Sequence, residues 1–235
     1  MRINKFISES GVASRREADR LIEKGKVTIN GKVAVLGDQV QPSDDVRLNG
    51  NSLKVVDELV YIAFNKPVGI TCTNARDVEG NIIDYIGHPL KINYVGRLDK
   101  ESNGLILLTN DGDIINLISR SKYNHEKEYN VLVDKPITSD FLKKMSAGVE
   151  ILDTKTLPCK ITQISKVEFQ IILTQGLNRQ IRRMCEALGY QVKELRRIRI
   201  MNIHLGKLSV GRWRDLTKIE KKELFNDLNY KPKDR

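Results

Sequence analysis

The sequence has few cysteines and no long apolar segment. Its 235 residues include three cysteines, Cys72, Cys159 and Cys185, which are odd in number and far apart. This usage does not match a disulfide framework and fits a reducing compartment. No apolar run approaches the length of a membrane span, and the first ten residues lack the apolar stretch of a secretory signal. Membrane and small secreted classes are therefore disfavoured, and we expect a cytoplasmic protein with no membrane partner.

The sequence also lacks the usual motifs of metal and cofactor sites. The three histidines, His88, His125 and His204, have no metal-ligand spacing, either with one another or with the cysteines. There is no P-loop and no dinucleotide-binding fingerprint. The Asp-Gly-Asp sequence at 111–113 is explained more simply by a turn and a helix N-cap at Asp113 than by a cation site. We therefore expect chemistry that uses neither a metal nor an organic cofactor.

Positive charge is the property that the sequence has in excess. Forty Lys and Arg residues against thirty Asp and Glu leave a formal net charge of +10. Residues 1–37 hold eight basic residues against four acidic ones, and residues 176–214 hold ten against two. Hydrophobic residues make up 40% of the chain, which is enough to bury a core. A folded protein with this charge is expected to bind a polyanion.

The first fifty residues read as a small separate module. The apolar spacing over 3–7 predicts a short helix. Ser14 and Glu17 have the spacing of a capping box and begin a second helix that ends at Gly25. A tight Asn-Gly turn inside 27–35 predicts a hairpin. We place this module at residues 1–50, and a linker at 51–58 because that stretch is polar and shows no periodicity.

Basic side chains gather on the polar faces of the two predicted helices. On charge alone, an ordinary solvated face and a nucleic-acid surface remain equally open. The candidate RNA-binding residues are Arg2 and Lys5 on the first helix and Arg15, Arg16 and Arg20 on the second.

The rest of the chain predicts a larger α+β domain over residues 59–228, followed by a loose tail at 229–235. Strands and helices mix without the regular alternation of a doubly wound sheet, which favours a mixed, largely antiparallel sheet. The candidate strands are 60–64, 105–108, 129–133 and 169–173, and the candidate helices are 113–120, 138–146 and 178–188.

Two segments of this domain carry candidate chemistry. Asp99 lies in a glycine-bounded loop before a buried strand, where a carboxylate could act as nucleophile or base, or could simply cap a turn. In the second segment, Asn178 could begin a helix on which Arg179 and Arg183 share one face and Arg182 lies on another side. These arginines fit either a solvated helix face or phosphate contacts.

The chain resembles two known families. Segments 2–5, 14–18 and 25–31 are similar to the S4 RNA-binding domain. Behind them, four ordered motifs resemble those of the RsuA-type ribosomal RNA pseudouridine synthases, and the similarity is closest to the RluF branch, which acts on large-subunit (23S) rRNA. These motifs occupy 65–69, 96–112, 127–129 and 176–184, and the branch similarity lies in 100–103, 145–148 and 199–202. Ser102 departs from the pattern, since many members have Thr there.

The resemblance implies isomerisation of a uridine in ribosomal RNA to pseudouridine without any cofactor. Asp99 would be the essential carboxylate and nucleophile, and Tyr129 would stack on the uracil. Arg182 would pair with Asp99, and Arg97 would fill the space left by the flipped base. The resemblance leaves open the acylal, Michael and glycal routes, and we expect a monomer whose partner is ribosomal RNA. Asn178, Arg179 and Arg183 would bind the RNA.

Two other classes of function remain open at this point. The first is a non-catalytic ribosome-binding or assembly protein, which the combination of Asp99, Tyr129 and Arg182 disfavours. The second is an RNA hydrolase or nuclease, which is disfavoured by the lack of an acidic metal-binding cluster and of a histidine pair.

Overall fold

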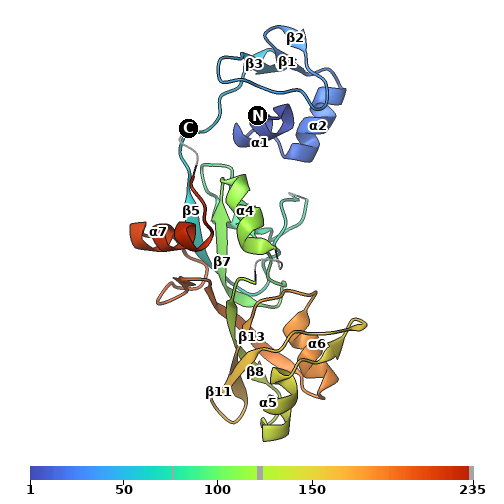
Figure 1. The fold of residues 1–235 in the computed structure, drawn as a ribbon, viewed down its shortest axis with the longest axis vertical. Helices are drawn as coiled ribbons and strands as arrows, with labels where there is room; N and C mark the ends of the chain where they lie inside the picture. The colour runs from blue at the N-terminus through green and yellow to red at the C-terminus, as the bar shows by residue number, and fades with distance from the viewer. Residues whose placement is uncertain (76, 121–123, 233–235) are drawn as a thin grey trace.

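The computed structural model describes residues 1–75, 77–120 and 124–232. The molecule is elongated, with a small N-terminal module at one end of its long axis and a larger domain below it (Figure 1). No helix among the described residues is long and apolar enough to cross a membrane.

The small module packs two helices on a four-stranded sheet. Its apolar core contains Ile3 and Ile7 from the first helix, Ala18 and Ile22 from the second, and Val27 from the sheet. The predicted helices and hairpin are therefore confirmed. The elements are α1 (Ile3–Glu9), α2 (Arg15–Glu23), β1 (Val27–Ile29), β2 (Lys32–Val33), β3 (Val46–Leu48) and β4 (Asn51–Ser52), and the strand order is β2-β1-β3-β4.

Two local details of the module differ from the sequence-based expectation. Ser14 caps α2 by accepting the Glu17 N–H, but the Glu17 carboxylate pairs with Arg20 at 3.2 Å, so only half of the predicted capping box forms. The small sheet also continues beyond the expected boundary at residue 50. Asn49 and Gly50 have φ values of 49° and 83°, and they form the turn between β3 and β4.

The larger domain is built on a mixed sheet. Its described residues form a nine-stranded sheet whose main path runs β11-β12-β8-β13-β7-β5-β15, with β14 beside β13 and β6 beside β7. The pairing of β13 with β7 is parallel, and the other pairings along this sheet are antiparallel. The expected α+β fold with a largely antiparallel sheet is confirmed. The strands are β5 (Tyr61–Lys66), β6 (Asn93–Val95), β7 (Asn103–Thr109), β8 (Lys127–Val133), β11 (Lys160–Gln163), β12 (Glu168–Leu173), β13 (Val192–Ile200), β14 (Ile203–His204) and β15 (Trp213–Asp215).

In the part of this domain that the structure describes, five helices and a short hairpin lie around the sheet. The three predicted helices are present, although the third begins at Gln180 rather than at residue 178. Asp111, not Asp113, is the N-cap of α4 and accepts the Asp113 N–H. The helices are α3 (Ile82–Ile86), α4 (Gly112–Ser119), α5 (Ser139–Ser146), α6 (Gln180–Ala187) and α7 (Lys218–Asp227), and the hairpin is β9 (Glu150–Ile151) with β10 (Thr154–Lys155).

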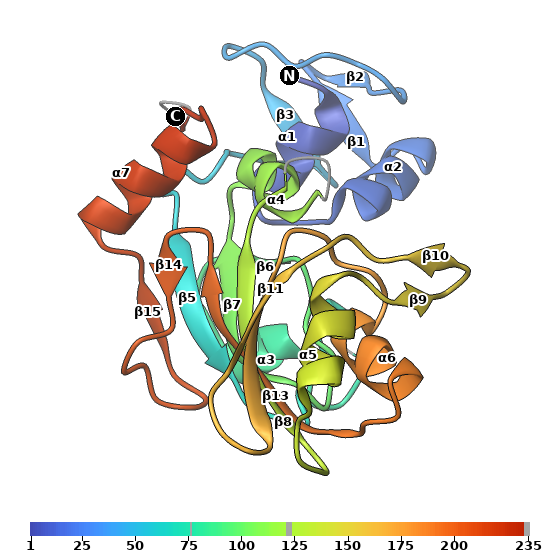
Figure 2. The same ribbon diagram turned by 60° about the horizontal axis from the view of Figure 1, so that its bottom comes forward.

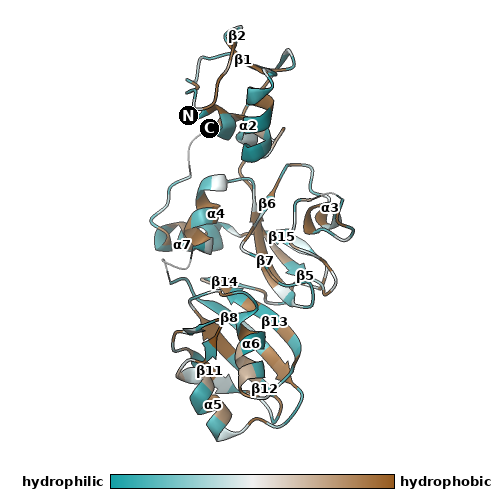
Figure 3. Cartoon of the chain, turned by 90° about the vertical axis from the view of Figure 1, so that its right-hand side faces the viewer, coloured by the Kyte–Doolittle hydropathy of each residue, from teal (hydrophilic) through white to brown (hydrophobic). Residues whose placement is uncertain are grey.

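The core is divided between the two ends of the sheet. At one end α5 and α6 pack on β8 and β12, with Phe141, Phe169 and Met184 fully or nearly fully buried. At the other end α4 and α7 pack beside β5 and β7 (Figures 1 and 2). Figure 3 shows apolar residues concentrated in the central strands and polar residues along α2. The sheet thus provides a rigid frame whose middle is bordered by loops.

The structure describes the predicted loose tail at 229–235 as far as residue 232, and Tyr230 within it makes specific contacts with the larger domain. The Tyr230 hydroxyl donates to Asp111 Oδ2 at 2.7 Å, and its ring packs edge-on against Phe225. Tyr61 donates to the same carboxylate oxygen. Burial of an aromatic ring together with a hydrogen bond to a carboxylate anchors this segment. Residues 233–235 lie outside the described residues.

Candidate active site

A cavity of about 180 Å³ opens near the middle of the large sheet. Cavities of about 150 Å³ bind a single benzene ring, so this one matches a single pyrimidine base in size. Its walls come from the loop before β7, from strands β8 and β13, and from the segment that enters α6. Residues that line it include Arg97, Asp99, Lys127, Tyr129, Arg179 and Arg197.

Asp99 is held at the cavity by the backbone on both sides of it. Leu98 is buried, and its N–H donates to Cys72 Sγ at 3.5 Å. On the other side, the Ser102 N–H donates to the Asp99 carbonyl, and the Lys100 carbonyl accepts the Gly69 N–H. These bonds fix the loop and leave the Asp99 side chain 33% exposed. A half-buried carboxylate on a rigid loop is suited to attack a bound substrate.

Tyr129 and Arg197 lie side by side at the centre of the sheet. They are directly paired in register between β8 and β13, and the Arg197 guanidinium carbon is 6.0 Å from the Tyr129 ring centroid. On its other side Arg197 is in register with Gly104 of β7. Because paired residues on neighbouring strands face the same way, the tyrosine ring and the guanidinium border one space.

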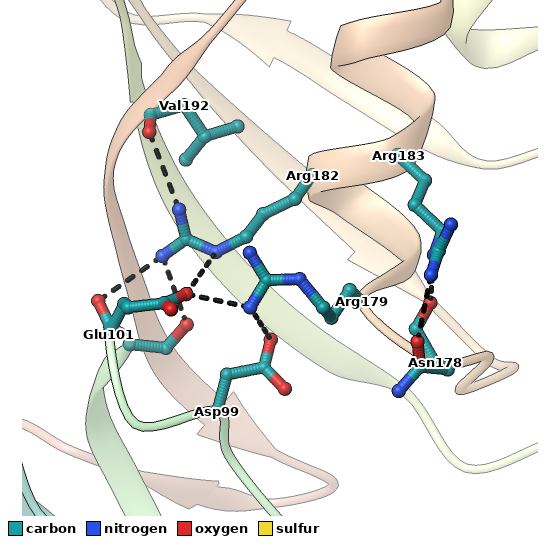
Figure 4. A network of polar contacts seen from close by, with 8 residues as sticks. Asp99, Glu101, Asn178, Arg179, Arg182, Arg183 and Val192 are labelled. Atoms are coloured by element: carbon teal, nitrogen blue, oxygen red, sulfur yellow. Dashed lines mark hydrogen bonds and ion pairs between the residues drawn. The ribbon is translucent and has the colours of Figure 1, made fainter.

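The arginine that faces Asp99 is not the one that the resemblance implies. Arg179 Nη1 lies 4.0 Å from Asp99 Oδ2 and 2.6 Å from Glu101 Oε2 (Figure 4). Arg182 instead donates to the carbonyls of Glu101 and Val192 and to the Ser102 hydroxyl. No ion pair joins Arg182 to Asp99, although both residues are described. The expected Arg182–Asp99 pair is therefore wrong in this structure.

The reason is the local backbone at the start of α6. Arg179 has a φ of 51° and a ψ of 33°, the left-handed conformation that non-glycine residues seldom adopt. The helix starts at Gln180, two residues after the predicted start, and the Arg179 side chain turns toward the loop that carries Asp99. Arg182 follows within the first turn and supports that loop from behind through its contacts with Glu101 and Ser102. The Arg179 hydrogen bond lowers the pKa of Glu101 below its usual value.

The other candidate RNA-binding residues of this segment contact each other. Arg183 donates through Nε to the Asn178 carbonyl at 3.1 Å and through Nη2 to the Asn178 side-chain oxygen at 3.2 Å. The pair is drawn apart from Asp99 in Figure 4, on the far side of Arg179. Asn178 is exposed and Arg183 is half-buried, so both remain accessible at the rim.

Four of the five candidate RNA-binding residues in the small module are exposed, and the fifth, Lys5, is half-buried and ion-paired. Arg2, Arg15, Arg16 and Arg20 lie on the surface. The Lys5 ammonium, by contrast, lies 2.6 and 2.8 Å from the two carboxylate oxygens of Asp113 on α4, and its side chain is only 18% exposed. RNA binding by Lys5 stays a prediction, and this ion pair with the larger domain competes with it. In this structure Lys5 connects the two domains.

The fully buried Lys66 and the half-buried Lys127 lie near Arg197 and had no role in the sequence analysis. Lys66 is fully buried and donates to the carbonyls of Pro67 and Ile70. Burial lowers its pKa to about 8, against the opposing effects of Cys72 and Asp99. Burial also lowers the pKa of Lys127 to about 8, and the nearby Arg197 adds to that shift. Both lysines lie in the sequence motifs, and Arg197 lies in the basic stretch at 176–214. The sequence did not show that these side chains point inward, because that depends on the register of the strands.

The described residues contain no group of three or more His, Cys, Asp and Glu side chains that could hold a metal ion. Chemistry without metal or cofactor stays a prediction.

Comparison with known proteins agrees with this geometry. The family model described as RNA pseudouridylate synthase matches residues 60–187, and the S4 domain model matches residues 1–46. The chain belongs to the RsuA family of pseudouridine synthases with an N-terminal S4 domain. It is therefore an isomerase that acts on RNA. Asp99, Tyr129 and Arg182 are all inside the matched range, as are most residues that line the cavity, whereas Leu195, Arg197 and Ile200 follow it.

Relatives and a solved structure cover nearly the whole chain. The dual-specificity RNA pseudouridine synthase RluF of Escherichia coli is 54% identical over 227 residues, which are 96% of this chain and 78% of that protein. Ribosomal large subunit pseudouridine synthase B of Bacillus subtilis is 38% identical and covers 95% of both chains. A crystal structure of a pseudouridylate synthase superposes with a TM-score of 0.71 at 30% identity, covering 95% of this chain and 99% of the other.

Proposed function

We propose that this synthase converts one specific uridine of large-subunit (23S) ribosomal RNA to pseudouridine, with Asp99 as the nucleophile and Tyr129 stacked on the uracil. The observation that carries the proposal is the convergence of Asp99, Tyr129 and four cations on one base-sized cavity. A carboxylate supplies the nucleophile, and a half-buried aromatic ring supplies a stacking surface.

The choice of RNA is supported by the relatives. The B. subtilis relative is named for the large ribosomal subunit, and the E. coli relative is named a dual-specificity RNA enzyme. We therefore expect a large-subunit rRNA substrate and a second RNA class, for which transfer RNA is the first candidate to test.

The reaction is balanced without any co-reactant. The N1–C1′ bond breaks, and its electron pair stays with the uracil. The ring then turns, C5 bonds to C1′, and the proton on C5 is released while N1 takes up a proton. Before this, the base must leave its stack to enter the cavity. The exposed Arg97 lies on the cavity wall, where its side chain would occupy the space that the base vacates.

The test is tritium release from RNA that carries C5-labelled uridine, under single-turnover conditions with saturating enzyme. Asp99→Asn keeps the side-chain size but removes the charge, so it should abolish release while RNA affinity and the unfolding temperature stay near wild type. Tyr129→Phe keeps a stacking ring and should retain RNA binding, which separates stacking from any proton transfer by the hydroxyl. Asp140→Asn, on the exposed face of α5, is the matched control and should behave like wild type.

Normal release by Asp99→Asn would exclude the nucleophile assignment. The substrate itself is tested by mapping pseudouridines in ribosomal and transfer RNA from cells with and without the enzyme. Loss of sites only in small-subunit rRNA would contradict the large-subunit proposal.

A further inference from the structure

Arg197 is a buried cation with an unsatisfied donor beside the cavity. It is 2% exposed, and its Nε donates to the Leu105 carbonyl at 2.7 Å. Its Nη2 is buried and has no hydrogen-bond partner among the described residues. Buried polar groups in folded proteins are almost always hydrogen-bonded, and an exception calls for a functional explanation.

The surroundings of Arg197 are positively charged. Lys127 lines the same cavity, and the buried Lys66 is close enough to Arg197 for the two charges to interact. Among the charged residues that line the cavity, Asp99 is the carboxylate, against the cations of Arg97, Lys127, Arg179 and Arg197. Positive charge therefore exceeds negative charge around the cavity, and a further negative charge placed beside the buried Arg197 would be stabilised there.

The reaction creates such a charge at this place. When the N1–C1′ bond breaks, the electron pair leaves the uracil ring negatively charged, with the charge spread over N1 and the carbonyl oxygens. Addition of a carboxylate to C6 also places negative charge on the ring. All three open routes therefore build negative charge on the base that would lie against Tyr129, whose register partner is Arg197.

We infer that Arg197, together with Lys127, stabilises the negatively charged uracil ring during isomerisation. This inference rests on the proposed placement of the base at Tyr129. Fixed charges that face developing charge in a dry site need no reorganisation, and they are worth more there than in water. The Nη2 donor reaches a uracil oxygen as the site tightens around the bound base, as apo-state hydrogen bonds commonly do.

A phosphate contact is the competing explanation for Arg197. A contact with an RNA phosphate requires a side chain that reaches solvent, as those of Arg97 and Arg179 do. Arg197 lies beneath the cavity and is nearly inaccessible. Depth thus favours contact with the base over contact with the backbone of the RNA.

The test compares Arg197→Gln and Arg197→Met with Arg196→Gln, assayed by single-turnover tritium release. Removing one donor of this kind typically lowers the rate about 100-fold to 1,000-fold, and we expect such a loss in both Arg197 variants at unchanged RNA affinity. The Met variant serves if the Gln variant is unstable, because an apolar side chain leaves no buried polar group. Arg196 is adjacent on β13 but on the other face of the strand, so its variant should keep a near-normal saturating rate.

A second readout uses 5-fluorouridine RNA. Fluorine at C5 stabilises the ring anion, so the reaction depends less on stabilisation by Arg197. The wild-type rate of N1–C1′ bond cleavage divided by the variant rate should therefore be smaller for 5-fluorouridine RNA than for uridine RNA. A wild-type saturating rate with weakened RNA binding in the Arg197 variants would overturn the inference in favour of a phosphate contact. An equal deficit on both substrates would make Arg197 merely structural. Failure of the wild-type enzyme to form any pseudouridine would instead overturn the proposed function.

Discussion

At the scale of single residues, the cations around the cavity fall into two groups by exposure. Arg97 and Arg179 are exposed at the rim, where solvated charges suit RNA phosphates. Lys66 and Arg197 are fully or nearly fully buried, and Lys127 is half-buried. Burial lowers the pKa of Lys66 and of Lys127 to about 8, so the charges of these two lysines respond to pH just above neutrality.

Lys127 leads to a prediction about pH. Its pKa is lowered to about 8, so it loses its proton as the pH rises through that value. If the protonated form stabilises the uracil charge, kcat/KM should fall about tenfold per pH unit above pH 8. Lys127→Arg stays charged throughout and should keep its rate to at least pH 9. The measurement is the pH profile of kcat/KM for wild type and for Lys127→Arg on the same RNA. Ionisation of the RNA then affects both profiles equally and cannot cause a difference between them.

Either of two other pH profiles of kcat/KM would contradict this role of Lys127. A rate that rises through pH 8 in the wild type would make neutral Lys127 a base. A fall that persists unchanged in Lys127→Arg would assign the titration to Lys66, whose pKa is also about 8.

The sequence predicted which residues meet at the site better than it predicted their pairing. Asp99 and Tyr129 border one cavity, as the resemblance implied, because loop and strand motifs fix their positions. Arg179, rather than Arg182, faces Asp99 because the Arg179 backbone is left-handed. Nothing in the Asn-Arg-Gln sequence requires that conformation. Arg197 was hidden for a different reason. Its inward direction follows from the pairing of β13 with β7 and β8, and that pairing is not local in sequence.

At the scale of elements, the parallel contact between β7 and β13 determines the position of Arg197. Gly104 has a φ of 103°, and a Cβ on it would lie 2.2 Å from the Arg197 carbonyl oxygen. Only glycine permits this approach, because any side chain would both clash with the β13 backbone and strain its own. The strand 105–108 was predictable from its apolar run. The close contact at Gly104 was not, since it involves a strand about ninety residues away.

Gly104→Ala should therefore separate the two strands. We expect it to destabilise the protein by about 3 kcal/mol or more, combining backbone strain with a clash against main-chain atoms that cannot move aside. Urea unfolding measures the effect.

Gly176→Ala is the matched control for this substitution. A Cβ there meets nothing within 4 Å, and its φ is not in the left-handed region. It should change stability by less than about 0.5 kcal/mol. Equal effects of the two substitutions would remove the argument that the β7–β13 approach requires glycine.

At the scale of the whole molecule, the S4 module presents its arginines from a position fixed on the larger domain. Lys5 on α1 pairs with Asp113 on α4, and the Val56 N–H in the linker donates to the Glu9 carbonyl. Figures 1 and 2 show α4 adjacent to α1. The basic face of α2 therefore has a defined direction relative to the larger domain.

The arginines of α2 should contribute affinity but not chemistry. Replacing Arg15, Arg16 and Arg20 together by Ala should weaken rRNA binding and reduce the slope of log K against log salt by about 2, at roughly 0.7 per phosphate contact. Binding titrations at salt concentrations from about 50 to about 200 mM measure this slope. Single-turnover release at saturation should remain near wild type. A folded triple variant with an unchanged slope would show that this face does not bind phosphate.

Lys5 should behave differently from these arginines, although all four are basic residues of the same module. Its ammonium is already occupied by Asp113, so Lys5→Ala removes an interdomain contact and no phosphate contact. We expect weaker binding to intact rRNA with the salt slope unchanged, because the arginines remain but their direction is less fixed. Asp113→Asn should produce the same loss, and the double variant should be no worse than either single one, as for partners in one interaction. A slope that drops by about 0.7 in Lys5→Ala would instead place Lys5 on the RNA.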